Sequence, residues 1–594
     1  MNIDFYNKKI EKNNILLTKL KSVIRIMPIL KLITFALLVV FFIIAFRVDS
    51  GMVYFFGLSF FMLMIFIFIQ NRDAKYCNDF AFYTDLNSVY QNEICFLQND
   101  FSPFYNGEMF VNKKHEFSYD LDIFGENSLY HRINRTTTYE GRVCLAQKLT
   151  NIPKSEDTIR TRQEALSELA EAAEFRFHFL AIGKRFYSLS NKNHLYIDSA
   201  QVNTFLTSDI ALWLIFSSIA VTVFTLLFAC LGYLPFVIPI LLFIIQLFIP
   251  TIYFGKTNKH ASEAGKLYKN LRRYSQMLAL IEKENFKAKD NILLKEILFS
   301  SYNSLKALDK LASILERFDQ RANVYILILL NALYLSDIFL LRSYAKWKQT
   351  YAGQLQLWID ALAEFEARIS LANYIYNKPN YSMPEIVNDN SLLIEAKEMG
   401  HPFISTDKLV TNDFNIYKSN FVIITGANMA GKSTFLRCAG INYLMAVNGM
   451  KVCASNFKCS LFQLFSNMRN TDNLSSGISY FNAELIRIEQ LIGFVKQQPH
   501  TLIILDEILK GTNSKDKLKG SIMFLTKMIE LPVTGLIATH DLELAKLEDE
   551  KPDLFHNYCF EINITDSIDY AYKIQRGVSK NLNATLLLEE ILSK

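Results

Sequence analysis

Four long apolar runs constrain the fold of this 594-residue chain more than any other feature; they cover residues 27–46, 52–69, 210–231 and 234–254. A helix needs about 20 apolar residues to cross the roughly 30 Å hydrocarbon core of a bilayer. Each run is close to that length. The only charge in them is Lys31, which lies one turn inside the first run and can extend to the lipid headgroups. The sequence therefore predicts four membrane-spanning helices.

The links within each pair of runs are short, Arg47–Ser50 and Gly232–Tyr233, so each pair predicts a helical hairpin. Basic residues gather outside the pairs, which is typical of the cytoplasmic side of a membrane. They are Lys8, Lys9, Lys12, Lys19, Lys21, Arg25, Arg72, Lys75, Lys256, Lys259, Lys266, Lys269, Arg272 and Arg273. We expect a multi-pass protein of the cytoplasmic (inner) membrane, with both termini and segments 73–209 and 255–594 in the cytosol.

Other interpretations of these features are a signal peptide, buried core helices, or a DNA-binding patch at 256–273. Polar residues 1–26 precede the first run and a second run follows it at once, which argues against a signal peptide. The net charge of +5 does not indicate binding to nucleic acid.

The eight cysteines form no C-x-x-C pair, so we expect free thiols in a reducing compartment, without disulfides or a zinc site.

The soluble segments begin as helices and end as an α/β domain. Residues 118–208 and 260–376 have helical character, with one helix expected from Ser155 through the run ending at Phe186. A buried helix face is predicted by apolar residues three or four positions apart: Leu355, Trp358, Leu362, Phe365, Ile369, Ala372 and Tyr376. Asn377–Pro384 ends that helix. After His401-Pro402, strands alternate with helices, which indicates a parallel sheet; the clearest strands are Phe421–Thr425, Thr501–Leu505 and Gly535–Thr539.

The first of these strands leads into a phosphate-binding motif, G-x-x-x-x-G-K-[ST]. Its residues are Gly426, Ala427, Asn428, Met429, Ala430, Gly431, Lys432 and Ser433, and a helix is expected from about Thr434. Glycines allow backbone N–H groups to turn toward phosphates, and the helix N-terminus attracts an anion. The motif therefore predicts ATP binding, with Lys432 on the β- and γ-phosphates and Ser433 on Mg²⁺.

The next two strands end at residues suited to hydrolysis. Asp506 is predicted to hold Mg²⁺, and Glu507 to activate the attacking water as a general base. His540 follows the third strand and is predicted to contact the γ-phosphate. Between them lies the polar loop Asp472–Phe481, which contains Ser479 and is the kind of loop that completes an ATP site from a second subunit.

These motifs together resemble the MutS family of DNA mismatch repair ATPases. Thr425–Thr434 with its internal Asn-Met, Asp506–Thr512 (D-E-I-L-K-G-T) and Ala538-Thr539-His540 are similar to that family's motifs. So are Leu474–Glu484, Met399–Pro402, Leu409–Asp413 and Tyr572–Gly577. A weaker resemblance extends over 118–398, where Ser128–Arg142 is similar to the start of the family's core domain.

The resemblance implies a homodimer with composite ATP sites, in which Ser479 reaches the partner's γ-phosphate and Thr434 helps to bind phosphate. It also implies DNA as a partner. The sequence departs from the family at Ala427 and Ala430, which replace Pro and Gly, and at Gly400, which replaces Arg. Membrane helices stand where the mismatch-reading domain would be. Phe124-Gly125-Glu126 matches that domain's wedge motif only by chance, and neither a clamp domain nor a C-terminal helix-turn-helix is recognisable.

The expected fold is mixed: four transmembrane helices in two hairpins, an α-helical core and lever, and a C-terminal α/β P-loop ATPase domain of ABC type. The predicted units are 1–26 (basic cytosolic N-terminus), 27–72 (hairpin), 73–117 (linker), 118–209 (core and first lever part), 210–254 (hairpin), 255–398 (lever helices) and 399–594 (ATPase domain).

The first functional hypothesis is a membrane-anchored ATP hydrolase that binds mismatched, branched or bent DNA in a repair-related role. The second is a tethered ATPase that has lost DNA binding and acts on membrane or protein partners. An ABC transporter is a third, disfavoured by where the membrane helices fall.

Overall fold

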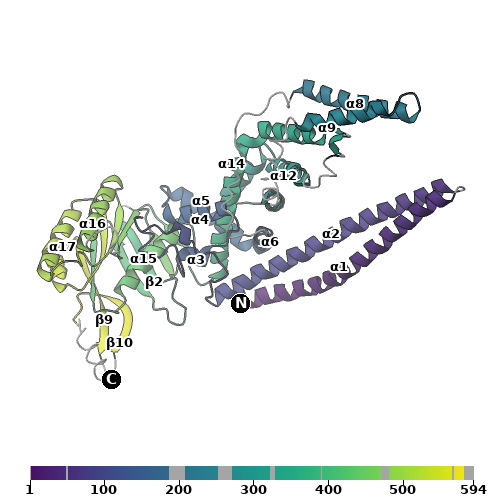
Figure 1. Cartoon of the computed structure of the whole chain (residues 1–594). Coiled ribbons are helices and arrows are strands. Elements are labelled where there is room, and N and C mark those ends of the chain that lie inside the picture. The colour runs from purple at the N-terminus through teal and green to yellow at the C-terminus, as the bar shows by residue number, and fades with distance from the viewer. Residues whose placement is uncertain are drawn as a thin grey trace.

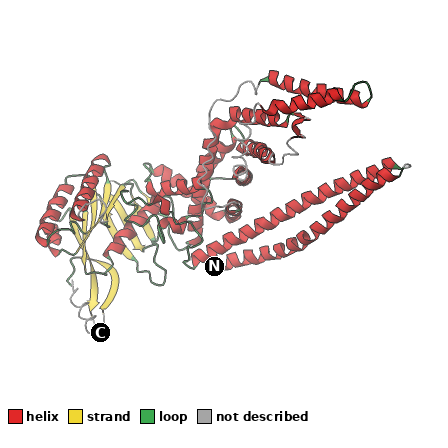
Figure 2. Ribbon diagram, in the orientation of Figure 1, coloured by secondary structure: helices red, strands yellow, loops and turns green. Residues whose placement is uncertain are grey.

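The computed structural model describes residues 2–48, 51–185, 208–251, 270–320, 328, 330–332, 334–389, 391–469, 480–564 and 568–580. Two helical hairpins extend to one side, an α/β domain lies at the opposite end, and a helical region joins them (Figure 1). Colouring by secondary structure separates the all-helical part from the strands, which lie only in the α/β domain within the described residues (Figure 2). The expected order of helical and α/β regions is confirmed.

The first hairpin is formed by α1 (Asn2–Arg47) and α2 (Met52–Leu97). Both helices continue far beyond their apolar runs, so residues 2–26 and 73–97 form a two-helix stalk. The segment 73–117, interpreted from the sequence as a linker, thus begins as the second half of α2 and adds Leu86 and Phe96 to the core. Lys31 Nζ lies 2.5 Å from Asp73 Oδ2 on α2. The structure therefore gives Lys31 an ion-pair partner within the hairpin.

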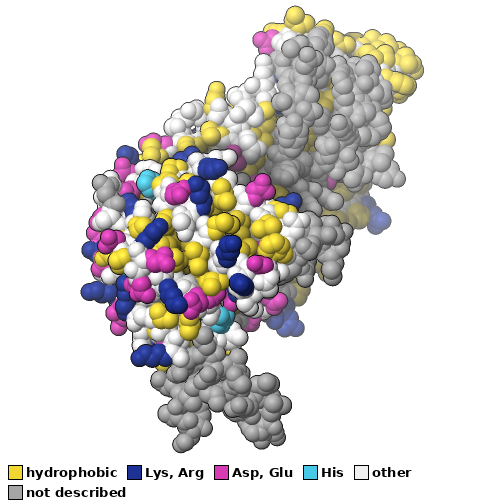
Figure 3. Space-filling model, turned by 90° about the vertical axis from the view of Figure 1, so that its left-hand side faces the viewer, with side chains coloured by type: hydrophobic (Ala, Val, Ile, Leu, Met, Phe, Trp, Pro, Cys, Tyr) yellow, Lys and Arg dark blue, Asp and Glu magenta, His cyan; other side chains and the backbone are white. Residues whose placement is uncertain are grey.

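Three helices, α1, α2 and α8 (Asp209–Cys230), are long and apolar enough to cross a membrane, by length and composition. The fourth predicted run forms a shorter helix in the described chain, α9 (Val237–Thr251). α9 begins at Val237, just after Pro235, whose carbonyl accepts the Ile238 N–H at 3.2 Å. Apolar side chains cover α8 and α9, which lie at the top of Figure 3, and Trp213 is 76% exposed.

The helical region contains α3 (Leu129–Ile133), α4 (Tyr139–Thr150), α5 (Glu156–Glu171), α6 (Ala173–Lys184), α11 (Lys289–Phe299), α12 (Ser304–Gln320) and α14 (Ser336–Asn377), with a 3-10 turn η1 (Glu108–Phe110). The single helix expected from Ser155 breaks at Ala172. Arg176 of α6 stabilises this break. Its guanidinium donates to the carbonyls of Leu169 and Ala170 and so caps the end of α5. The predicted face of α14 is buried except for the half-buried Tyr376, and the helix ends at Asn377 as expected. The expectation of only one buried face is wrong for residues 365–375, which are buried on every side because other helices pack around them.

The α/β domain has two sheets. The larger has the order β10-β9-β4-β8-β7-β6, and the smaller β1-β5-β2-β3. The strands are β1 (Glu385–Ile386), β2 (Leu392–Met399), β3 (Asn412–Tyr417), β4 (Phe421–Gly426), β5 (Asn456–Cys459), β6 (Gln463–Asn467), β7 (Thr501–Asp506), β8 (Val533–Thr539), β9 (Phe555–Ile564) and β10 (Ile568–Arg576). The helices are α15 (Lys432–Val447), α16 (Tyr480–Gln497), α17 (Ser514–Met528), η3 (Leu542–Lys546) and α18 (Leu547–Glu550). The three strands predicted most clearly, β4, β8 and β7, are adjacent and parallel.

A strap from the helical region, residues 114–122, covers the edge strand β6. The Ser466 N–H of β6 donates to the Glu116 carbonyl at 2.9 Å, so the strap extends the sheet's hydrogen bonding. Arg469 binds Asp122 through two bonds of 2.6 and 2.7 Å. Arg437 of α15 and Arg487 of α16 donate to strap carbonyls. The strap therefore joins the helical region to the helices that follow β4 and precede β7.

A buried polar network attaches the first hairpin to α14. Arg135 Nε donates to Glu93 Oε1 of α2 at 2.6 Å, and the two side chains are 2% and 1% exposed. Asn377 Nδ2 donates to the other Glu93 oxygen, and Tyr6 of α1 donates to Asn377 Oδ1 at 2.8 Å. Both hairpin helices thus meet the end of α14 in one network.

Replacing Glu93 by Gln tests how far the fold depends on this network. The change leaves the buried Arg135 cation without its counter-charge, and breaking one side of such a pair costs about 3–5 kcal/mol. We expect a clear fall in the unfolding temperature of the detergent-solubilised protein, followed by tryptophan fluorescence. The exposed neighbour Gln91 is the control: Gln91→Ala should leave the unfolding temperature nearly unchanged. Equal unfolding temperatures for Glu93→Gln and wild type would contradict the assignment.

Candidate functional site

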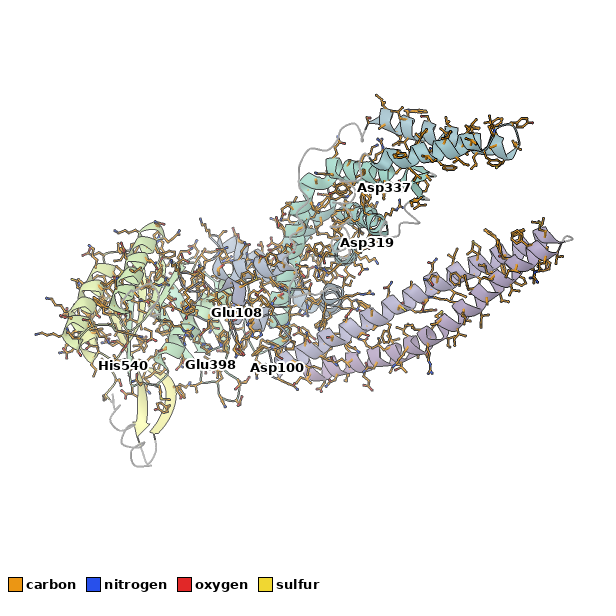
Figure 4. All side chains as sticks on the ribbon, in the orientation of Figure 1. Asp100, Glu108, Asp319, Asp337, Glu398 and His540 are labelled. Carbon is orange, nitrogen blue, oxygen red and sulfur yellow. The ribbon has the colours of Figure 1, made fainter. Side chains whose placement is uncertain are left out.

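A cavity of about 650 Å³ lies where the loop after β4 meets the residues that follow β7 and β8. Carboxyl ends of parallel strands lie along one edge of a sheet, so side chains from distant parts of the sequence converge there. The segment between β2 and β3 closes another side of the cavity. His540, which lines it, lies in the α/β domain near the point where β9 and β10 leave the sheet (Figure 4).

The loop between β4 and α15 depends on two glycines. Gly426 and Gly431 have φ angles of 151° and 108°, which side-chain-bearing residues rarely adopt. A Cβ on Gly426 would also lie 2.8 Å from the Phe560 carbonyl oxygen of β9. The loop therefore packs closely on β9 and delivers the chain to the first turn of α15, whose N-terminus favours an anion.

Lys432 lies almost wholly buried at the base of the cavity. Its ammonium donates to the carbonyls of Gly426 and Ala427, both at 2.9 Å, and lies 3.3 Å from Nε2 of His540. Burial lowers the pKa of Lys432 to about 8, against the opposing attraction of Asp506 and Glu507. Burial and the Lys432 charge also lower the pKa of His540, so its Nε2 is suited to accept a bond from the ammonium.

The site has two carboxylates, one at the end of β7 and one at the start of the turn that follows. Asp506 is the last residue of β7, and Glu507 follows with a φ of 59°. The Glu507 carboxylate lies 3.5 Å from Lys517 Nζ of α17 and 3.8 Å from Nε2 of His540. The Glu507 carboxylate therefore lines the cavity between an imidazole and an ammonium.

The donor set suits Mg²⁺ accompanied by phosphates. The Ser433 hydroxyl and the Asp506 carboxylate line the same cavity, and hard oxygen donors are what Mg²⁺ prefers. Among the described residues, no group of three His, Cys, Asp or Glu side chains could hold a metal on its own. An ion bound here would therefore draw its remaining ligands from phosphate oxygens and water.

The other side of the cavity is formed by the chain between β2 and β3 together with α15 and β10. His401, Val410, Phe435 and Tyr572 line it. Burial and two arginines lower the pKa of His401 to about 4, which keeps the ring neutral at physiological pH. Asn412 fixes β10 against this segment, donating to the Tyr572 carbonyl at 3.1 Å and accepting from the Ile574 N–H at 2.9 Å.

The structure brings most of the predicted site residues to one cavity. Asn428, Met429, Ala430, Gly431, Lys432, Ser433, Thr434, Asp506, Glu507 and His540 line it, and Gly426 and Ala427 begin the loop. Ser479 lies outside the described residues. Ala427 and Ala430, two departures from the family, are both buried in the loop. The chemical roles assigned to these residues stay predictions.

Sequence reasoning missed two side chains that act on the Glu507 turn. Lys517 pairs with Glu507 from α17, and no motif marks it. Glu484 was noticed only as the end of the polar loop, yet its carboxylate accepts the N–H groups of Lys510 and Gly511, both at 3.0 Å. The available signal for Glu484 was its place at the end of the family-like stretch Leu474–Glu484.

These features define an α/β domain whose strand–loop–helix unit has the geometry of a P-loop. Residues 422–585 match the family model of MutS domain V. The chain is similar to the "DNA mismatch repair protein MutS" of Acetivibrio thermocellus, with 32% identity over 238 residues, which is 39% of this chain and 27% of that protein. The MutS protein of Thermotoga maritima is 32% identical over 224 residues, covering 37% and 27%. That of Ruminiclostridium cellulolyticum is 33% identical over 229 residues, covering 36% and 25%.

The α/β domain of this chain is therefore related to domain V of the MutS family. The chain spans about a quarter of the length of the curated relatives that it matches, 27% of the Acetivibrio thermocellus protein. The resemblance drawn from the motifs is thereby confirmed for the α/β domain.

Gly426→Ala tests the close packing of the loop. The added methyl group meets the Phe560 carbonyl and the backbone is strained, so we expect a loss of about 1–3 kcal/mol of stability in this domain. Thermal unfolding and hydrogen exchange of residues 421–436 would measure it. Gly493→Ala on α16 is the matched control, because nothing lies within 4 Å of its new Cβ. If both variants exchange like wild type, the loop does not need glycine at 426.

Proposed function

We propose that this chain is a membrane-anchored ATPase that binds Mg²⁺–ATP in the cavity at the carboxyl edge of the larger sheet. The observation that carries the proposal is the convergence of Lys432, Ser433, Asp506, Glu507 and His540 on one cavity beside a helix N-terminus. The match to MutS domain V supports it, because it covers all of these residues.

Each side chain has a distinct part in the proposed reaction. Lys432 neutralises the β- and γ-phosphates, and backbone N–H groups of residues 428–433 orient them. Ser433 and Asp506 would hold Mg²⁺, which when bound offsets negative charge on the phosphates. Glu507 takes a proton from the attacking water, and His540 contacts the γ-phosphate. Thr434 adds a hydroxyl beside the phosphates.

We further propose a homodimer in which Ser479 completes the partner's site, with the hairpins anchoring the protein in the cytoplasmic membrane and the α/β domain in the cytosol. Support for the anchoring comes from three helices of sufficient length and apolarity and from both hairpins extending away from the α/β domain (Figure 1). DNA is the proposed substrate, since the curated relatives are named as DNA mismatch repair proteins.

A second candidate function is an ATPase that acts on membrane or protein partners without DNA. The buried network of Tyr6, Glu93, Arg135 and Asn377 favours it, because it attaches the stalk of the first hairpin directly to the helical region. On the described part of the end face in Figure 3, basic and acidic side chains are interspersed. That face attracts a polyanion such as DNA less strongly than a continuous basic surface would.

Steady-state ATP hydrolysis by the nanodisc-held protein tests the proposal. We expect turnover that requires Mg²⁺ and falls at least a hundredfold in Glu507→Ala, because general-base catalysis contributes about 10²–10⁴-fold. Heteroduplex and branched DNA are then added at low salt. A several-fold change in turnover supports DNA handling, and indifference to every DNA moves the choice to the second function. Turnover equal in wild type and Glu507→Ala would refute the proposed active site.

Nucleotide affinity should depend on pH through Lys432. Its pKa of about 8 means that the ammonium loses its proton as the pH rises above that value. Only the charged form attracts phosphate, so affinity should be constant for this group below pH 8 and fall above it, by up to about tenfold per pH unit. A fluorescent nucleotide titration between about pH 6.5 and 9.5 measures this fall. Lys432→Met should bind weakly with no such slope, whereas a flat wild-type profile would exclude Lys432 as the phosphate ligand.

A further inference from the structure

The turn that carries Glu507 has an unfavourable backbone. Glu507 and Leu509 have φ angles of 59° and 56°, so two side-chain-bearing residues lie in the left-handed region within three positions. Each such residue costs about 1–2 kcal/mol relative to its relaxed conformation. Contacts from elsewhere must therefore hold the turn in place.

On one side, α17 supplies those contacts. Leu509 packs against Gly520, where an added Cβ would lie 2.5 Å from Leu509 Cδ1. Lys517 of the same helix pairs with the Glu507 carboxylate. These contacts fix one side chain and one charge, but they leave the N–H groups after Leu509 to be satisfied by another partner.

Glu484 of α16 is that partner. Its Oε1 accepts the Lys510 N–H and its Oε2 the Gly511 N–H, each at 3.0 Å. The side chain is 1% exposed, so water cannot replace either bond. A carboxylate has an acceptor on both oxygens, whereas the isosteric amide of Gln would turn an NH₂ group toward one of the two N–H donors.

We infer that Glu484 is a positioning residue for hydrolysis: it holds the strained turn through two backbone N–H groups and so sets the place of Glu507. The inference rests on the proposed ATPase function and adds a residue to which that function gives no role. Glu484 lines no part of the nucleotide cavity, so its effect should fall on the chemical step and not on nucleotide binding.

Four forms of the full-length protein in nanodiscs test this: wild type, Glu484→Gln, Glu484→Asp and Glu489→Gln. Glu489 is the matched control, an exposed acid on the same helix. In Glu484→Gln we expect kcat to fall at least tenfold, while KM for Mg²⁺–ATP and the affinity for a fluorescent ATP analogue change less than threefold. Glu489→Gln should behave as wild type. Glu484→Asp, which keeps both acceptors but ends one methylene short, should give an intermediate kcat.

Hydrogen exchange of residues 507–513 provides a readout independent of turnover. The Lys510 and Gly511 amides should exchange at least tenfold faster in Glu484→Gln, with the rest of α16 unchanged. If wild type is active and Glu484→Gln has the same kcat, the inference is overturned while the proposed function stands. So would parallel losses of kcat, nucleotide affinity and unfolding temperature, which indicate a purely structural role. A wild type without ATPase activity would instead refute the proposed function and the inference with it.

Discussion

The attachment of the first hairpin to the helical region depends on one buried ion pair, between Arg135 and Glu93. Neither charge has access to water, and the Arg135 guanidinium also stacks on Phe104, 3.8 Å from the ring centre. A buried pair of this kind is strongly destabilising when it is incomplete, so the partners cannot separate independently. Because Glu93 also binds Asn377, and Asn377 binds Tyr6, both helices of the first hairpin are fixed to the C-terminal end of α14.

The same helix reaches the second hairpin at its other end. Arg342 donates to the Ser208 carbonyl at 2.6 Å, and Phe339 lies against Phe216 of α8. The chain leaving α14 after Asn377 enters β1 and β2 of the α/β domain within a few residues. One 42-residue helix therefore contacts both hairpins and leads into the domain that carries the cavity. In the proposed function, this helix connects the domain that binds ATP to both membrane hairpins.

The features that could be predicted well from the sequence are those set by local sequence patterns. β4, β7 and β8 are continuous apolar runs followed by chemically distinctive residues, so strand positions and the members of the cavity could be read directly. The length of the stalk could not be predicted, because polar side chains such as Asn13 and Asn87 are buried there through hydrogen bonds between positions 74 residues apart. The break at Ala172 was hidden for the same reason: it depends on where the Arg176 guanidinium turns, and good helix formers surround it.

The candidate site shows the same division between motif and support. Residues that would touch phosphate or metal belong to motifs, because their chemistry restricts the residue type at each position. Residues that hold the motifs from outside them, such as Lys517 and Arg437, act through geometry that many sequences could supply. Arg437 makes the point most clearly: it lies one turn beyond the loop on α15, yet it bonds to the Asp120 carbonyl of the strap, 317 residues away. The glycines of the loop between β4 and α15 thus allow it to pack closely on β9. The helix that follows the loop is bonded to the helical region. Any rearrangement of the strap must therefore act on the first turns of α15, where the phosphates are proposed to bind.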